Sequence, residues 1–305
     1  MDKEVNSNTA YYKIANLCLC INYHNGLNIS RLLPNFEPFK LIDDTKDEVI
    51  CNINLNIKNL NFDDTEANLL SDISIVWGNR FTFWEAEDKY WTLVDSSIQD
   101  VRAATMSSSK TFEDNYIVID DNYSDKSSII SWFCMVAFAQ CSLNYKSILF
   151  HASVVKHEEC KIAFAFLGKS GTGKSTHSRL WLNSLDGYSL LNDDNPIVKV
   201  EDDGKVNIYG TPWSGKTKCY KNDKAELKGL VRLVQAPKNI FKHRSSKEAL
   251  IALLPSCSAL RWDSNLYATL VDSLIEIINE IQIGELHCLP NTEAAVICNK
   301  ELFKL

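Results

Sequence analysis

The chain of 305 residues lacks any apolar run long enough to cross a bilayer. Its most apolar stretch, 129–139, ends before Gln140, whereas a transmembrane helix needs about 20 apolar residues. The opening residues Met1–Ser7 are polar and lack the apolar core of a secretory signal peptide. We therefore expect a cytoplasmic protein with no membrane partner, and a buried helix at about 125–143.

Basic clusters are missing as well. Lys and Arg total 32 against 39 Asp and Glu, which gives a net charge of −7. A surface that binds nucleic acid needs a concentrated positive patch, so this composition argues against a nucleic-acid partner. No internal repeat or low-complexity tract is present, and 45% hydrophobic residues are enough for a proper core.

The ten cysteines lack any C-x-x-C pair and scatter from Cys18 to Cys298. Such a distribution gives no disulfide framework and no metal-ligand spacing. Buried free thiols are therefore the expected state.

The first third of the chain alternates between apolar and polar residues. Val49, Cys51 and Ile53 alternate with Ile50, Asn52 and Asn54, the period of a half-buried strand. Further strands are predicted at 11–23, 73–77, 81–84, 90–94 and 116–119. We expect a β-rich, mostly antiparallel domain at 1–122, ending in the polar stretch 120–126.

The second domain is predicted at 123–305 and mixes both element types. Because only a short polar turn separates 148–155 from 162–167, these two strands should pair antiparallel. Further strands are expected at 188–191, 197–200, 205–209, 227–235 and 286–289. Helices are expected at 125–143, 174–185, 246–254, 264–281 and 292–299. Ser245 and Glu248 have the spacing of a capping box.

The segment 168–175 reads G-x-x-x-x-G-K-S, between the apolar run 162–167 and a helical pattern. This strand–loop–helix context is typical of a phosphate-binding loop, in which backbone N–H groups and a helix N-terminus face one anion. We expect a bound nucleoside triphosphate, with Lys174 on the β- and γ-phosphates and the Ser175 hydroxyl on Mg²⁺. The nucleotide-binding residues predicted are Gly168, Ser170, Gly171, Thr172, Gly173, Lys174, Ser175 and Thr176.

Two aspartates, Asp193 and Asp194, follow the predicted strand 188–191. A magnesium-binding carboxylate is expected after a P-loop helix, and a pair allows one to serve the metal while the other accepts a proton. The same residues also suit a polar turn. His151, on the strand next to the P-loop strand, is either near the phosphates or a structural histidine.

These pieces together resemble the HPr kinase/phosphorylase family. The resemblance rests on Phe150–Ser153, on Gly168–Ser175 and on Leu191–Asp194, in that order and at about this spacing. The P-loop and the aspartate pair are also similar to ATP-dependent phosphoenolpyruvate carboxykinase. The stretch Gly210–Lys216 looks like the Gly-Thr-Pro-Trp loop of HPr-kinase-like proteins. The glycine-arginine-asparagine signature of true HPr kinases is absent from the sequence, so HPr itself is not implied as the substrate.

The resemblance implies a carboxykinase-like P-loop domain with a mixed sheet, using ATP and Mg²⁺. Ser175 and Asp193 would serve the metal, Asp194 would be the general base, and His151 would contact the transferred phosphoryl group. The aspartates could exchange these roles. Lys216 and Arg244 are candidates for binding an anionic substrate, although each could equally be a solvated surface cation.

The function predicted is a kinase that phosphorylates a hydroxyl, either a peptide serine or a small molecule. The alternative is a non-catalytic nucleotide-binding regulator or scaffold. Retention of both aspartates favours the enzyme, because a pure binder needs no general base. The acceptor, ATP rather than GTP, and assembly into a homo-oligomer remain open at this stage.

Overall fold

The computed structural model describes residues 7–42, 48–56, 60–76, 79–96, 101–215 and 217–303. The chain divides into two compact units, Met1–Cys141 and Ser142–Leu305. Each unit is built on a mixed sheet with helices, which confirms the predicted α/β class. The division falls later than the predicted boundary at 122, because the helix after that boundary packs on strands of the first unit.

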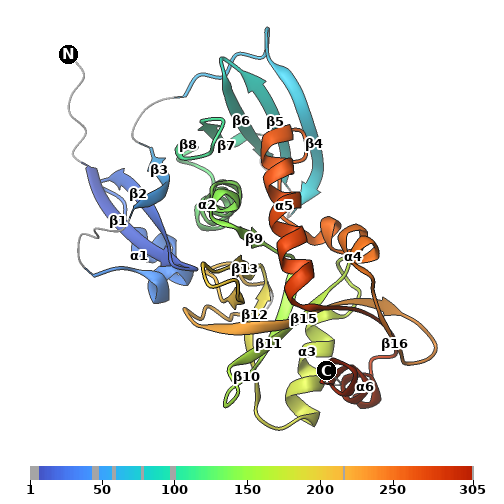
Figure 1. The fold of residues 1–305 in the computed structure, drawn as a ribbon. Helices are drawn as coiled ribbons and strands as arrows, with labels where there is room; N and C mark the ends of the chain where they lie inside the picture. Colours follow the sequence, from blue (N-terminus) through green and yellow to red (C-terminus); the bar gives the residue numbers. More distant parts are fainter. Residues whose placement is uncertain are drawn as a thin grey trace. The chain divides into compact units, whose positions relative to one another are not determined.

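The described part of the first unit forms an eight-stranded sheet in the order β1-β2-β3-β8-β7-β6-β5-β4 (Figure 1). Its strands are β1 (Ser7–Ile14), β2 (Leu17–His24), β3 (Val49–Leu55), β4 (Asn68–Val76), β5 (Asn79–Ala86), β6 (Lys89–Ser96), β7 (Val101–Ser108) and β8 (Asp114–Ile119). Its helices are α1 (Ile29–Leu32), a 3₁₀ turn at Pro34–Phe39 and α2 (Lys126–Cys141). The pairs β2–β3 and β3–β8 are parallel and the others antiparallel, so the β-rich prediction is confirmed.

The single strand predicted at 11–23 is wrong: the structure has a hairpin there. Ala15 and Asn16 turn the chain with φ values of 52° and 62°. Two consecutive positive φ values fit the tight hairpin turns that glycine or asparagine usually marks, and alanine hides that signal. Strand β7 was missed because its sequence has no clean alternation.

Helix α2 packs on β3, β7 and β8, and its Trp132 ring lies 4.3 Å from that of Phe81. With the 3₁₀ turn Ser142–Tyr145 that follows, α2 is long and apolar enough to cross a membrane by composition alone. However, 67% of that stretch is buried inside the protein, and the core helix of a soluble protein passes the same test.

The second unit holds the segment 168–175, predicted to be a P-loop. Its strands are β9 (Ser147–Leu149), β10 (Ala152–His157), β11 (Ile162–Leu167), β12 (Tyr188–Asp194), β13 (Ile197–Val200), β14 (Val206–Tyr209), β15 (Lys224–Gln235), β16 (Ile240–His243) and β17 (Gln282–Cys288). Its helices are α3 (Lys174–Ser184), α4 (Ser246–Leu253), a 3₁₀ turn Leu254–Ser256, α5 (Ser264–Glu280) and α6 (Thr292–Leu302). The predicted capping box of α4 is present at Ser245 and Glu248. Strand β16, which pairs with β17, was not predicted.

The predicted antiparallel pairing of β10 with β11 is confirmed. The predicted strand 148–155 is nevertheless wrong in one respect, because it is broken at Phe150 and His151. The first part, β9, pairs with β13, whereas β10 pairs with β11 and β12. The break releases His151 from the ladder, so its position is set by tertiary contacts.

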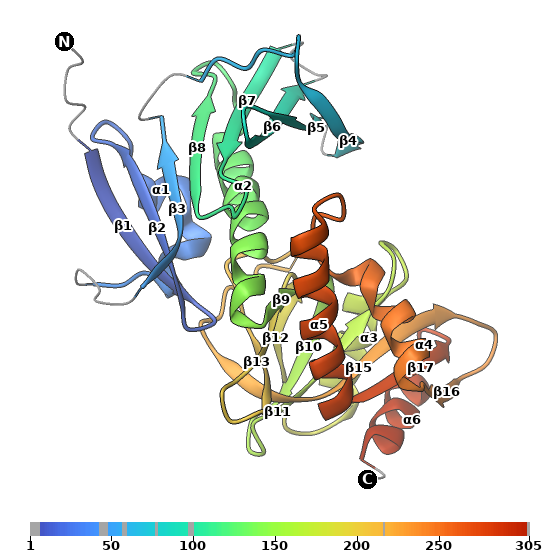
Figure 2. The same ribbon diagram turned by 45° about the horizontal axis from the view of Figure 1, so that its top comes forward.

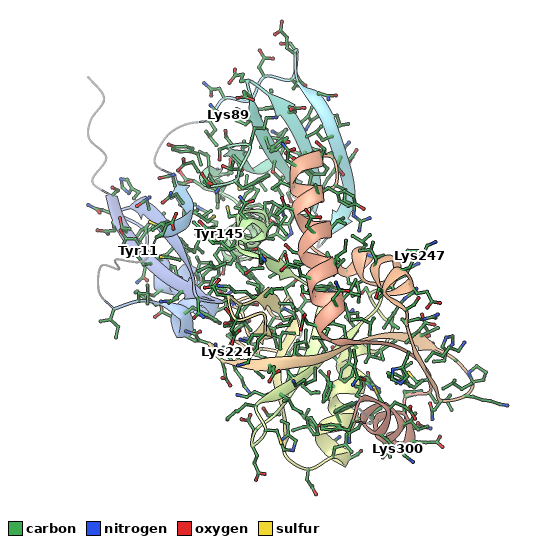
Figure 3. The ribbon with its side chains drawn as sticks, viewed as in Figure 1. Tyr11, Lys89, Tyr145, Lys224, Lys247 and Lys300 are labelled. Atoms are coloured by element: carbon green, nitrogen blue, oxygen red, sulfur yellow. The ribbon has the colours of Figure 1, made fainter. Side chains whose placement is uncertain are left out.

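Helices cover both faces of this sheet. Phe164 and Phe166 of β11 pack with Trp181 of α3 and with α6 in one buried cluster. On the other face, α4 packs on β17 and α5 on β9 and β13. In Figure 1, α4 and α5 lie above β15 and α3 and α6 below it, and Figure 2 shows α4 and α5 side by side. Lys247 on α4 and Lys300 on α6 mark the two faces in Figure 3.

Candidate functional site

The predicted P-loop follows directly from the carboxyl end of β11. Gly168, Gly171 and Gly173 have φ values of 150°, 80° and 106°, conformations that favour glycine. A Cβ added at Gly171 or Gly173 would meet nothing within 4 Å, so the loop leaves open space for a ligand. The Thr172 backbone and hydroxyl both donate to the Lys169 carbonyl, at 3.1 and 2.6 Å, and close the loop.

Helix α3 begins at Lys174, with Gly173 as its N-cap. The Lys174 ammonium donates to the Gly168 carbonyl at 3.0 Å and lies 2.9 Å from Nε2 of His151. Burial lowers the pKa of Lys174, and the nearby carboxylates of Asp194 and Asp193 act in the opposite direction. The lysine, the histidine and the aspartate pair therefore share one electrostatic neighbourhood.

His151 is held at the break between β9 and β10. Its backbone N–H donates to the Ser256 carbonyl at 2.7 Å, and its Nδ1 lies 3.0 Å from Oδ1 of Asp194. An ammonium group can only donate, so Nε2 accepts from Lys174 and the proton of a neutral ring sits on Nδ1, facing Asp194. The predicted proximity of His151 to the P-loop is confirmed by this Lys174–His151–Asp194 chain.

The two aspartates end β12 in different surroundings. Asp193 is opposite Ser153 of β10 and is only 5% exposed. Asp194 is opposite Ala152, its side chain is 31% exposed, and it accepts a hydrogen bond from the Asn195 amide at 2.8 Å. A partly exposed carboxylate suits proton transfer with a substrate, and a buried one suits a fixed ligand. The two aspartates thus differ in burial, and their roles stay a prediction.

Asn192 and Thr211 build a frame beneath the aspartates that sequence reasoning missed. The Asn192 amide donates to the Thr211 hydroxyl at 3.2 Å, and its oxygen accepts from the backbone of Asp194 and of Asn195, both at 3.1 Å. The Thr211 hydroxyl donates to the Asn195 carbonyl at 2.7 Å. Both side chains are fully buried. The only signal in the sequence is that each belongs to a motif quoted for the family resemblance.

The residues present fit a magnesium–nucleotide complex. Mg²⁺ is usually held by one or two carboxylates together with substrate phosphates and water. Among the described residues no group of three or more His, Cys, Asp or Glu could hold a metal by itself. A Mg²⁺ ion bound to phosphates needs few protein ligands. Asp193 and Ser175, which is in the first turn of α3, would be enough for such an ion. Ser170 and Thr176 lie in the loop and in that same turn.

Of the two residues predicted to bind an anionic substrate, Arg244 and Lys216, the structure describes only Arg244. Arg244 donates to Glu285 at 2.5 Å and to Glu248 at 3.2 Å, so it is part of an ion-pair network. Lys216 lies outside the described residues.

Comparisons with known proteins give little. No family model matches the sequence, and no curated protein matches it. Among solved structures, one similar chain is that of the Hpr(Ser) kinase/phosphatase from Coxiella burnetii, with a TM-score of 0.29 and 12% identity. That match covers 50% of this chain and 91% of the other. A likeness at this level carries no argument, so the function rests on the site itself.

Proposed function

We propose that this protein is an ATP- and Mg²⁺-dependent kinase with a carboxykinase-like P-loop domain, which phosphorylates a hydroxyl of a peptide or small molecule. The observation that carries the proposal is the Lys174–His151–Asp194 chain beside the P-loop. A loop that only binds nucleotide needs Lys174 and the glycines. It does not need an exposed carboxylate held by a histidine next to the lysine.

The chemistry follows from these positions. Asp194 accepts the proton of the acceptor hydroxyl while the acceptor oxygen forms a bond to the γ-phosphorus. The bond between that phosphorus and the bridging oxygen breaks, and ADP leaves with the electron pair. Lys174 offsets the charge on the phosphates, and His151 orients Asp194 through Nδ1–H. Mg²⁺, held by Asp193 and Ser175 when bound, would supply further charge neutralisation.

Replacing Lys174 by alanine tests the nucleotide site. The change removes a charge-assisted contact of about 1.5–3 kcal/mol, so ATP affinity should fall by roughly 10- to 150-fold. Isothermal titration calorimetry with MgATP measures this. Lys169→Ala is the matched control, because Lys169 is an exposed lysine of the same loop. Equal affinities for wild type and Lys174→Ala would remove the P-loop assignment.

Thr211→Val tests whether the buried frame positions the base. Valine keeps the shape but loses the hydroxyl that links Asn192 to the Asn195 carbonyl. A small displacement of a catalytic group can cost about 100-fold, so ATP hydrolysis should fall by roughly 10- to 100-fold while ATP affinity is kept. Thr211→Ser should restore the rate, because it returns the hydroxyl.

A double-mutant cycle tests whether Thr211 acts through Asp194. Once Asp194→Asn has removed the base, adding Thr211→Val should cost little more, since both changes act on the same group. If Thr211→Val lowers the rate equally in both backgrounds, its role is structural only. Ser178→Ala, which removes another buried hydroxyl of this unit, is the control.

A further inference from the structure

A row of residues crosses the sheet on the face that α4 covers. Residues paired in register on neighbouring strands point to the same face. From β12 to β16 the paired residues are Asp194, Ala152, Leu167, Arg232, Glu285 and Lys242. The proposed base and Arg232 therefore share one face and one row, and Leu167, directly before the P-loop, lies between them.

The spacing of this row places Arg232 within reach of a bound substrate. Adjacent strands are about 4.8 Å apart, so three steps put the backbones of Asp194 and Arg232 about 14 Å apart. Gln235, at the end of the same strand, donates to the carbonyls of Gly171 and Thr172 at 3.3 and 3.4 Å. Parallel strands of α/β sheets gather ligands at their carboxyl ends, which is where β11, β15 and β17 bring these residues.

The α4 segment contacts residues near both ends of this row. Glu248 near its start accepts from Arg244, and Ser256 just after it accepts from the His151 backbone. The histidine of the candidate site and Arg244 thus contact the two ends of this segment, the turn after α4 and the start of α4.

Arg232 forms an ion pair with a buried carboxylate and remains open to solvent. The Glu285 side chain is 7% exposed and bonds tightly to Arg244, at 2.5 Å, and to His287, at 2.7 Å. Burial would raise the pKa of Glu285, but hydrogen bonds from His287 and Arg244 outweigh it and hold that pKa below its usual range. Arg232 lies farther away, at 3.6 Å, and its side chain is 44% exposed. At that distance the pair with Glu285 is an ion pair without a hydrogen bond, so the guanidinium keeps its N–H donors for a ligand.

The charges here are unusual for this chain. Arg232, Arg244 and the exposed Lys242 are three cations around two carboxylates, Glu285 and Glu248, on a protein of net charge −7. An acidic protein repels an anionic substrate unless a local positive site receives it. Guanidinium groups are well suited to carboxylate and phosphate groups, which they bind through two parallel hydrogen bonds.

We propose that Arg232, supported by Glu285, Arg244 and Lys242, forms an oxyanion subsite for the acceptor. The acceptor is then a hydroxyl compound or peptide that carries a carboxylate or phosphate group apart from the reacting hydroxyl. This proposal rests on the kinase function proposed above and names its substrate class.

The test uses inorganic phosphate as the probe on the full chain. With the P-loop saturated by Mg²⁺ and the non-hydrolysable analogue AMP-PNP, phosphate should still bind, as measured by calorimetry. Arg232→Gln should weaken phosphate binding at least about tenfold and leave the affinity for AMP-PNP unchanged. Lys238→Gln, an exposed cation after the same strand, is the matched control and should change neither.

Several outcomes would overturn the subsite. It is absent if the nucleotide-saturated wild type binds no phosphate, or if Arg232→Gln binds phosphate as well as wild type does. If Arg232→Gln weakens AMP-PNP instead, the arginine belongs to the nucleotide. Thermal melting checks that the variant is folded. Arg232→Lys keeps the charge but loses the two parallel donors of the guanidinium, so its affinity for phosphate should be intermediate. The AMP-PNP titration of the same samples shows separately whether the nucleotide site itself fails.

Discussion

Replacing Asp194 by asparagine should lower ATP turnover by about 100- to 10,000-fold and leave MgATP affinity close to wild type. Asparagine keeps the size of the side chain and can still meet Nδ1–H of His151, but it cannot take up a proton. The ammonium of Lys174 and the loop glycines, which hold the phosphates in the proposed site, are unchanged. The loss should therefore appear in kcat rather than in KM.

Acceptor-independent ATP hydrolysis measures this effect without knowledge of the acceptor, since water then takes the place of the hydroxyl. Asp203→Asn, in the exposed turn between β13 and β14, is the matched control and should hydrolyse ATP normally. If Asp194→Asn hydrolyses ATP near the wild-type rate, Asp194 is not the base, and Asp193→Asn becomes the next variant to measure. A protein whose hydrolysis depends on neither aspartate would be the non-catalytic nucleotide binder considered from the sequence.

The second large effect is a loss of stability of α3 in acid. His177 is buried in α3, accepts from the Trp181 indole N–H at 3.0 Å and packs on the Phe166 ring. Burial lowers the pKa of His177 from 6.5 to about 4. The unfolded chain then takes up a proton more readily than the native one. The contribution of His177 to the free energy of unfolding is therefore fully present above pH 6.5. It is lost as the pH falls toward 4, by about 3 kcal/mol.

Hydrogen exchange of the α3 amides, followed by mass spectrometry from pH 7.5 to 4, measures this loss locally. His177→Gln keeps an acceptor for Trp181 but does not titrate, so its opening free energy should change much less over that range. His243→Gln is the control, because His243 is half exposed on β16. Identical pH profiles for wild type and His177→Gln would show that other groups cause any acid instability. Because α3 begins at Lys174, nucleotide binding should weaken over the same pH range in which the helix loses stability.

Much of the local structure was determined by the sequence. The segment 162–175 predicts strand, loop and helix, because buried β-branched and aromatic residues, glycines at positive φ and a helix start each have local signatures. The capping box at Ser245 and the short turn after β10 are local in the same way. The sequence predictions failed where the local signal is weak. Ala15 and Asn16 form a turn without glycine, and the sequence of β7 does not alternate between apolar and polar residues.

The candidate site was only partly predictable, because its parts meet through the sheet. Lys174, Asp193 and Asp194 were identified from their motifs, but the sequence left His151 between a structural and a functional role. Tertiary structure places it beside Lys174 and Asp194, since the strand breaks at that residue and a carbonyl of the turn after α4 fixes its backbone.

Cross-strand register decided the rest. Asp194, Leu167 and Arg232 are far apart in the sequence, and nothing local relates them. They share one row only because β12, β10, β11 and β15 pair in a particular register. Local interactions determined which residues could hold a phosphate. The long-range pairing of strands determined which candidate residues lie on one face, because the direction of a side chain on a sheet depends on register.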